Sequence, residues 1–120
     1  MTIGDVVDFV ESVPRGRAFP NCTKTDILGL IKEGLEDCGL IVFTNKDKPI
    51  GILLLKAYEQ QKSVWVKNIL CHPSCCSECM KKAFEIYKQR FNGWKLLVQR
   101  HDKFRTITPS ERLINFFIGE

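Results

Sequence analysis

The chain has 120 residues, of which 44% are hydrophobic and 27% are charged, a length and composition typical of one globular domain over residues 1–120. No apolar run approaches the roughly 18 residues of a membrane-spanning helix, and no signal peptide is visible, so we expect a cytoplasmic protein without a membrane partner. The net charge is +4. Residues 1–60 hold seven Lys and Arg against nine Asp and Glu, and residues 61–120 hold eleven against five. The positive surplus of the second half is more typical of a solvated surface than of a strong nucleic-acid binder.

Two helices are predicted in the first forty residues. The first covers residues 3–13, has apolar residues at helical spacing and ends at Pro14. Its apolar face consists of Ile3, Val6, Val7 and Val10. The second begins at a threonine cap, Thr23 or Thr25, and ends where Gly39 can adopt a left-handed cap. We therefore expect a helical first third of the domain.

Three strands are predicted next, over residues 39–43, 50–58 and 63–70. The polar turn from Asn45 to Lys48 separates the first two and indicates a hairpin. The second strand is almost wholly apolar from Ile50 to Leu55. Such a run predicts a central strand that is covered on both faces of the sheet.

The remaining residues predict a helix, a strand and a second helix. Cys71-His72-Pro73 ends the third strand, and residues 75–91 have helical periodicity. A strand follows at Trp94–Val98, then a polar loop at Gln99–Thr106, and Thr108-Pro109 opens a last helix. The fold class is therefore α/β, with a small, mostly antiparallel sheet of about four strands and three to four helices.

Three segments together resemble a known family. Residues 39–51 have the form of a strand, a charged turn and a strand that starts with Ile-Gly. Residues 69–73 have an apolar strand end followed by Pro, and residues 110–119 form a late helix that ends in Ile-Gly. This order resembles the GNAT family of acyl-CoA N-acyltransferases over roughly 80 residues. It implies a truncated GNAT-like fold that lacks the family's first strand and its last two.

The resemblance also implies positions for a cofactor. In that family the strand that ends here near Cys71 diverges from its neighbour and binds the pantetheine arm, and a glycine-rich loop holds the diphosphate at a helix N-terminus. The implied contacts are Ile69, Leu70 and Cys71 for pantetheine, and Cys76, Ser77, Cys79 and Lys81 for the diphosphate. The loop has no glycine, however, and Glu78 brings a like charge to the diphosphate position.

The leading hypothesis is therefore a non-catalytic, GNAT-derived binding or assembly protein, which needs no cofactor. It is similar to small GNAT-like proteins of bacteriophages, some of which are virion or assembly components. We expect a protein partner or self-association, because the missing strands leave sheet edges exposed. The alternative is an acetyl-CoA-dependent N-acetyltransferase. Phe116 or Phe117 stands where the family often has a tyrosine acid, and neither can donate a proton.

A third hypothesis is nucleic-acid binding by basic residues around the fourth predicted strand. The candidate residues for an anion or an acidic partner are Lys95, Arg100, His101, Lys103 and Arg105. Cations with a nearby aromatic residue are typical of phosphate and base contacts. A solvated loop is the more common arrangement of such residues.

A cysteine cluster lies between the third strand and its following helix. Cys76-x-x-Cys79, with Cys71, His72 and Cys75 nearby, offers soft ligands to zinc or a redox pair at a helix N-terminus. A zinc site usually takes a second ligand pair from a distant segment, and a thioredoxin-like context is also missing. We therefore expect no metal, and cysteines that act as small buried hydrophobic residues.

Overall fold

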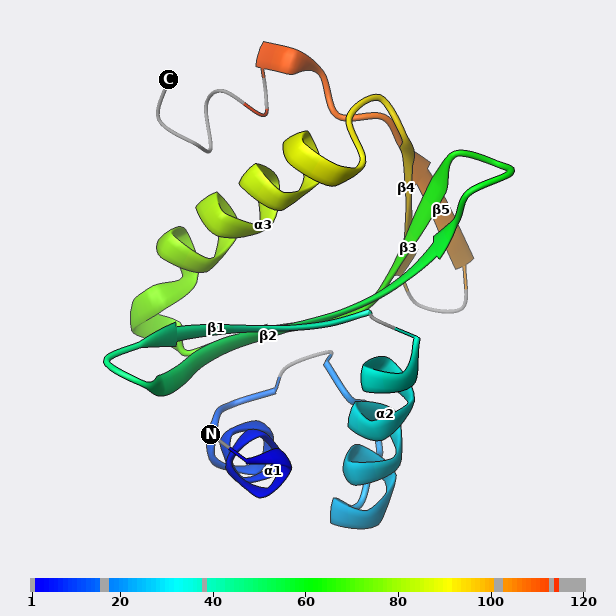
Figure 1. The fold of residues 1–120 in the computed structure, drawn as a ribbon. Coiled ribbons are helices and arrows are strands. Elements are labelled where there is room, and N and C mark those ends of the chain that lie inside the picture. The colour runs from blue at the N-terminus through cyan, green and yellow to red at the C-terminus, as the bar shows by residue number, and fades with distance from the viewer. Residues whose placement is uncertain (1, 16–17, 38, 101–102, 113, 115–120) are drawn as a thin grey trace.

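The computed structural model describes residues 2–15, 18–37, 39–100, 103–112 and 114 (Figure 1). The elements are α1 (Ile3–Ser12), α2 (Lys24–Glu36), β1 (Leu40–Asn45), β2 (Lys48–Tyr58), β3 (Ser63–Cys71), a one-turn 3-10 helix (Pro73–Cys75), α3 (Cys76–Arg90), β4 (Lys95–Arg100) and β5 (Lys103–Ile107). The strands form one sheet in the order β1-β2-β3-β4-β5. Figure 1 shows α1 and α2 on one face of this sheet and α3 on the other.

The α/β class is confirmed, but the sheet has five strands and not four. All strand pairs are antiparallel except β3 and β4, which are parallel. The prediction of a polar loop at Gln99–Thr106 is wrong, because Lys103–Ile107 forms β5 beside β4. Only Phe104 and Ile107 of the five β5 residues are apolar, and they are three positions apart, so the alternation typical of a strand is missing from the sequence.

The last predicted helix falls partly outside the described residues. Glu111, Arg112 and Ile114 are helical, and the Ile114 N–H donates to the Ser110 carbonyl at 3.0 Å. Ile114 is buried. No helix within the ranges that the structure describes is long and apolar enough to cross a membrane.

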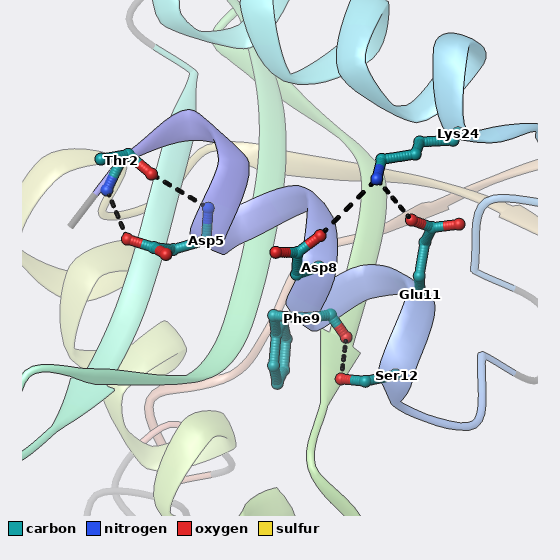
Figure 2. Close-up of polar contacts among 7 residues, drawn as sticks. All are labelled: Thr2, Asp5, Asp8, Phe9, Glu11, Ser12 and Lys24. Atoms are coloured by element: carbon teal, nitrogen blue, oxygen red, sulfur yellow. Dashed lines mark hydrogen bonds and ion pairs between the residues drawn. The ribbon is translucent and has the colours of Figure 1, made fainter.

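Helix α1 begins at a capping box (Figure 2). The Asp5 N–H donates to the Thr2 hydroxyl at 3.2 Å, and the Thr2 N–H donates to the Asp5 carboxylate at 2.7 Å. These two bonds satisfy backbone donors that have no partner within a helix. Four residues of the helix are buried: Val6, Val7, Phe9 and Val10. The predicted first helix is confirmed, and it ends before Pro14.

The same device starts α2, where Thr23 and not Thr25 is the cap, with Asp26 as its partner. Lys24 at this helix start lies 3.9 Å from the Asp8 carboxylate and 3.7 Å from that of Glu11 in α1 (Figure 2). These ion pairs are exposed, so they stabilise the fold little. Burial of apolar side chains therefore holds the two helices against the sheet.

Strand β2 is the centre of the domain, as predicted. It lies between β1 and β3, and every residue from Ile50 to Leu55 is buried. Ile52 and Leu54 pack in the cluster with α1 and α2, whereas Leu53 and Leu55 pack in the cluster with α3. The alternation of side chains along a strand thus supplies both layers of the core.

Candidate functional site

Strands β3 and β4 are neighbours for only part of their length. They pair from Ser63 opposite Lys95 to Val66 opposite Val98. β3 then continues to Cys71, and in the described part of the chain β4 pairs beyond Val98 only with β5. The second half of β3 therefore presents a backbone edge that no described strand covers.

A β-bulge explains this divergence. On the β2 side of β3, Leu54 lies opposite Asn68 whereas Leu55 lies opposite Val66, so Lys67 is an extra residue. A bulge bends its strand and increases the local twist. Pairing with β4 ends at Val66, immediately before the bulge. The bulge therefore turns the rest of β3 away from β4.

The diverging half of β3 is anchored to the helical layer on the opposite face from α3. The Asn68 side-chain oxygen accepts a hydrogen bond of 2.9 Å from the N–H of Phe19, whose side chain is 1% exposed. Lys67 lies 3.3 Å from the Glu33 carboxylate of α2. The bulge and these two contacts hold the strand in its diverging course.

The three predicted pantetheine contacts lie in this half of β3, but their backbone N–H and C=O groups do not all point to the same side of the strand. The His72 N–H donates to the Ile50 carbonyl at 2.8 Å. Because bonded pairs alternate along an antiparallel ladder, Leu70 also bonds to β2. The backbone groups of Ile69 and Cys71 then point to the uncovered edge. Two of the three residues can therefore bind a ligand there.

The start of α3 follows directly after this edge. The His72 ring nitrogen Nδ1 lies 3.2 Å from the Ser74 backbone nitrogen, which donates to it, and 2.7 Å from the Ser74 hydroxyl. Cys76 and Ser77 begin α3 and are exposed, and the preceding residue gives the helix no side-chain cap. Free N–H groups at such an end attract anions.

The acidic side chain of Glu78 opposes diphosphate binding at this helix start. Glu78 lies in the first turn of α3 and is exposed, with its carboxylate 3.3 Å from Lys82 Nζ. A carboxylate in the first turn already complements the positive end of the helix dipole. Lys81 is exposed on the same helix. The helix start is thus a poorer anion site than a glycine-rich loop.

Cys79 contributes no side chain to this helix start. It has 0% exposure, and its thiol donates to the Ile50 carbonyl at 3.6 Å. A Cβ atom built on Gly51 would lie only 2.6 Å from Cys79 Sγ. The glycine in β2 therefore makes room for a buried thiol, and Cys79 is part of the core between α3 and the sheet.

The thiols of Cys79 and Cys76 are near enough to the Cys71 thiol to act on its pKa. Burial raises the pKa of Cys71 to about 12, and the neighbouring thiols act in the same direction. Burial also raises the pKa of Cys79. Cys76 is exposed, so the expectation of uniformly buried cysteines is wrong for this residue. Within the described ranges, no three His, Cys, Asp or Glu side chains form a group that could hold a metal ion.

The predicted basic residues are divided between the two ends of the β4–β5 hairpin. Lys95 and Arg100 begin and end β4, about 17 Å apart at about 3.3 Å per residue. Arg100 pairs with Lys103, while Arg105 is exposed in the middle of β5. His101 lies outside the described residues. The structure therefore does not bring Lys95 together with the other cations.

An apolar cavity of about 310 Å³, which the sequence did not reveal, lies between α3 and the sheet. Its walls include Leu55, Val66, Phe84, Leu96 and Ile107, which come from five different elements. Sequence periodicity identifies the apolar residues of each element, but it does not show that the five elements enclose one cavity. The lining has almost no polar group to orient a ligand, so we assign none to it.

No protein-family model, curated protein or solved structure matches this chain. A function is therefore inferred from the geometry alone.

Proposed function

We propose that this chain is a GNAT-like, non-catalytic binding or assembly protein that associates with a second copy of itself through strand β1. The family part of this proposal is supported by the strand order, the single parallel pair β3–β4 and the divergence of these two strands ahead of α3. The non-catalytic part is supported by the glycine-free start of α3, where Glu78 competes with an anion.

The observation that carries the proposal is the uncovered edge of β1. This strand pairs only with β2 in the described part of the chain, and residues 40–45 include no charge. Leu40, Ile41 and Val42 are half-buried. An apolar edge strand without charges is a template for pairing with another chain.

The direction of the β1 backbone groups identifies the donors that a partner would use. The Leu55 N–H donates to the Gly39 carbonyl at 2.7 Å. Since bonded pairs alternate, Ile41 bonds to β2, and the N–H and C=O groups of Leu40 and Val42 point outward. These outward groups can join a strand from another molecule.

The opposite edge of the sheet is less suited to pairing. β5 has five residues, and two of them, Lys103 and Arg105, are cationic. Charged residues, lysine above all, are a common device that keeps edge strands from pairing. The contrast between the edges favours β1 as the contact.

A second copy is the occupant that β1 fits best. Two β1 strands that pair antiparallel present the same residues to each other, which is the arrangement of a two-fold symmetric dimer. No charge in residues 40–45 would repel its symmetry mate. The dimer would extend the sheet across both molecules.

Val42→Pro tests this contact. Proline removes the outward N–H of Val42, and an edge strand tolerates proline where the lost N–H faces away from its neighbour. Val42→Ala is the matched control, because it shortens the same side chain but keeps the N–H. In sedimentation over a wide concentration range, we expect dimers for the parent chain and the alanine variant, and monomers for a folded proline variant. A parent chain that stays monomeric throughout would overturn the proposal.

An acetyl-CoA-dependent N-acetyltransferase is the second candidate function. It is supported by the outward backbone groups of Ile69 and Cys71, which suit a pantetheine arm, whereas the start of α3 suits the diphosphate poorly. Calorimetry with acetyl-CoA at low salt separates the two. Micromolar binding would favour the transferase, and no heat at millimolar cofactor would favour the assembly protein.

Nucleic-acid binding is the third candidate, and exposed Lys95 and Arg105 support it. It predicts an affinity that falls steeply as salt is raised, because phosphate contacts release counterions. Binding that is absent at low salt would remove this candidate.

A further inference from the structure

We propose that Cys71 and Cys76 are a dithiol modification site, which a small-molecule disulfide such as oxidised glutathione converts into a reversible Cys71–Cys76 disulfide. The site joins the end of β3 to the first residue of α3. It is independent of the proposed assembly through β1.

The position of Cys71 follows from its partner in β2. Cys71 lies opposite Gly51, and residues opposite each other on neighbouring strands point to the same face. Cys79 Sγ from α3 lies over Gly51 on that face. The Cys71 side chain therefore lies on the face of the sheet that α3 covers, with Cys79, and the thiols of Cys79 and Cys76 are near enough to raise the pKa of Cys71.

Cys76 is the thiol that a reagent meets first. It is exposed, and its Sγ lies 3.7 Å from the His72 carbonyl, at the turn that connects β3 to α3. It is also the first residue of the 15-residue helix α3. Exposure lets this thiol reach a small disulfide in solution.

Cys79 is protected from the same reagent. It has no exposed surface, and its thiol is engaged with the Ile50 carbonyl. Cys71 is half-buried, and the Cys76 thiol is near enough to raise the pKa of Cys71. Cys71 is therefore the thiol that resolves a mixed disulfide formed on Cys76.

The reaction balances in two exchanges. The Cys76 thiolate attacks one sulfur of the small disulfide, a new S–S bond forms, and one small thiolate leaves and takes up a proton. The Cys71 thiolate then attacks Cys76 Sγ, the Cys71–Cys76 bond forms, and the second small thiolate leaves and is protonated. Two protein thiols are oxidised, and one disulfide is reduced to two thiols.

The second exchange has a distinctive pH dependence. Burial raises the pKa of Cys71 to about 12, so its thiolate is scarce at neutral pH. Below that pKa the thiolate fraction, and with it the rate of resolution, rises about tenfold per pH unit. The mixed disulfide on Cys76 should therefore accumulate at pH 6.5 and resolve after a jump to pH 9.

The test treats the whole chain with oxidised glutathione and follows intact mass and disulfide-linked peptides. We expect one added glutathionyl group on Cys76 at pH 6.5, and a Cys71–Cys76 bridge with loss of that group at pH 9. Cys71→Ser should stop at the mixed disulfide. Cys22→Ser, which changes a half-buried free thiol outside the cluster, should behave as the parent chain does.

Two results would overturn the proposal. One is a bridge that maps to Cys79 or Cys75 in place of Cys71. The other is a mixed disulfide on Cys76 that persists at pH 9 in the parent chain. Circular dichroism shows whether Cys71→Ser is folded, and Cys71→Ala, tested in the same way, separates loss of the thiol from any effect of the serine hydroxyl.

Discussion

Gly51 in β2 and Cys79 in α3 are complementary, because the missing side chain of one makes room for the thiol of the other. A Cβ atom at Gly51 would lie 2.6 Å from Cys79 Sγ and 3.1 Å from a ring carbon of Phe43. Helix α3 can therefore approach the sheet closely at this point. The contact also orders the neighbourhood of Cys71, which lies opposite Gly51.

Gly51→Ala should destabilise the domain by about 1–3 kcal/mol, the usual cost of overpacking a core. The same change should cost less in a Cys79→Ala background, because the sulfur that the new methyl group meets is gone. Urea unfolding of the parent, both single variants and the double variant measures this coupling. Equal costs in the two backgrounds would show that the Gly51–Cys79 contact is not the cause.

Asn68→Ala should destabilise the domain by about 1–3 kcal/mol, since it leaves a buried backbone donor without its acceptor. The donor is the N–H of Phe19, 2.9 Å from the Asn68 side-chain oxygen. Asn45→Ala is the control, because Asn45 is exposed at the end of β1 and its replacement should change stability by less than about 0.5 kcal/mol. Similar losses for both variants in chemical unfolding would contradict the anchoring role of Asn68.

Leu54→Ala should cost about 2–5 kcal/mol, because it removes a fully buried side chain from the central strand. Leu54 is 2% exposed, whereas Leu35 in α2 is 48% exposed. Leu35→Ala makes the same chemical change at the surface and should cost far less. Thermal unfolding compares the two, and comparable losses would argue against β2 as the centre of the core.

The capping box of α2 should make stability depend on acid pH. The Thr23 N–H that donates to the Asp26 carboxylate lowers the pKa of Asp26 below its ordinary value of 3.8. A carboxyl whose pKa is lower in the folded state stabilises the fold above the unfolded pKa, and this contribution disappears as pH falls through the folded pKa.

We therefore expect the difference in melting temperature between the parent chain and Asp26→Asn to be present at pH 6 and to shrink below pH 3.8. Glu36→Gln removes an exposed carboxylate at the other end of α2 and serves as the control. A parent–Asp26→Asn difference that stays constant between pH 6 and pH 2.5 would contradict a role for the ionised cap.

The sequence by itself determined the elements whose signals are local. Helical spacing and a following Pro14 predicted α1, and a continuous apolar run predicted β2 as the covered central strand. These features depend on the order of side chains within one segment, so no distant contact is needed to recognise them. The predicted positions of Ile69 and Cys71 at the end of β3 were local in the same sense.

Only the tertiary structure decided the features that depend on residues far apart in the chain. β5 forms a strand because its backbone pairs with that of β4. β3 diverges from β4 because of a bulge that depends on the register between β3 and β2. Cys76 and Cys79 are three residues apart, yet one is exposed and the other is buried over Gly51. Burial and strand pairing depend on which elements pack together. A sequence pattern predicts which face of a helix or strand is apolar, but it does not predict which other element covers that face.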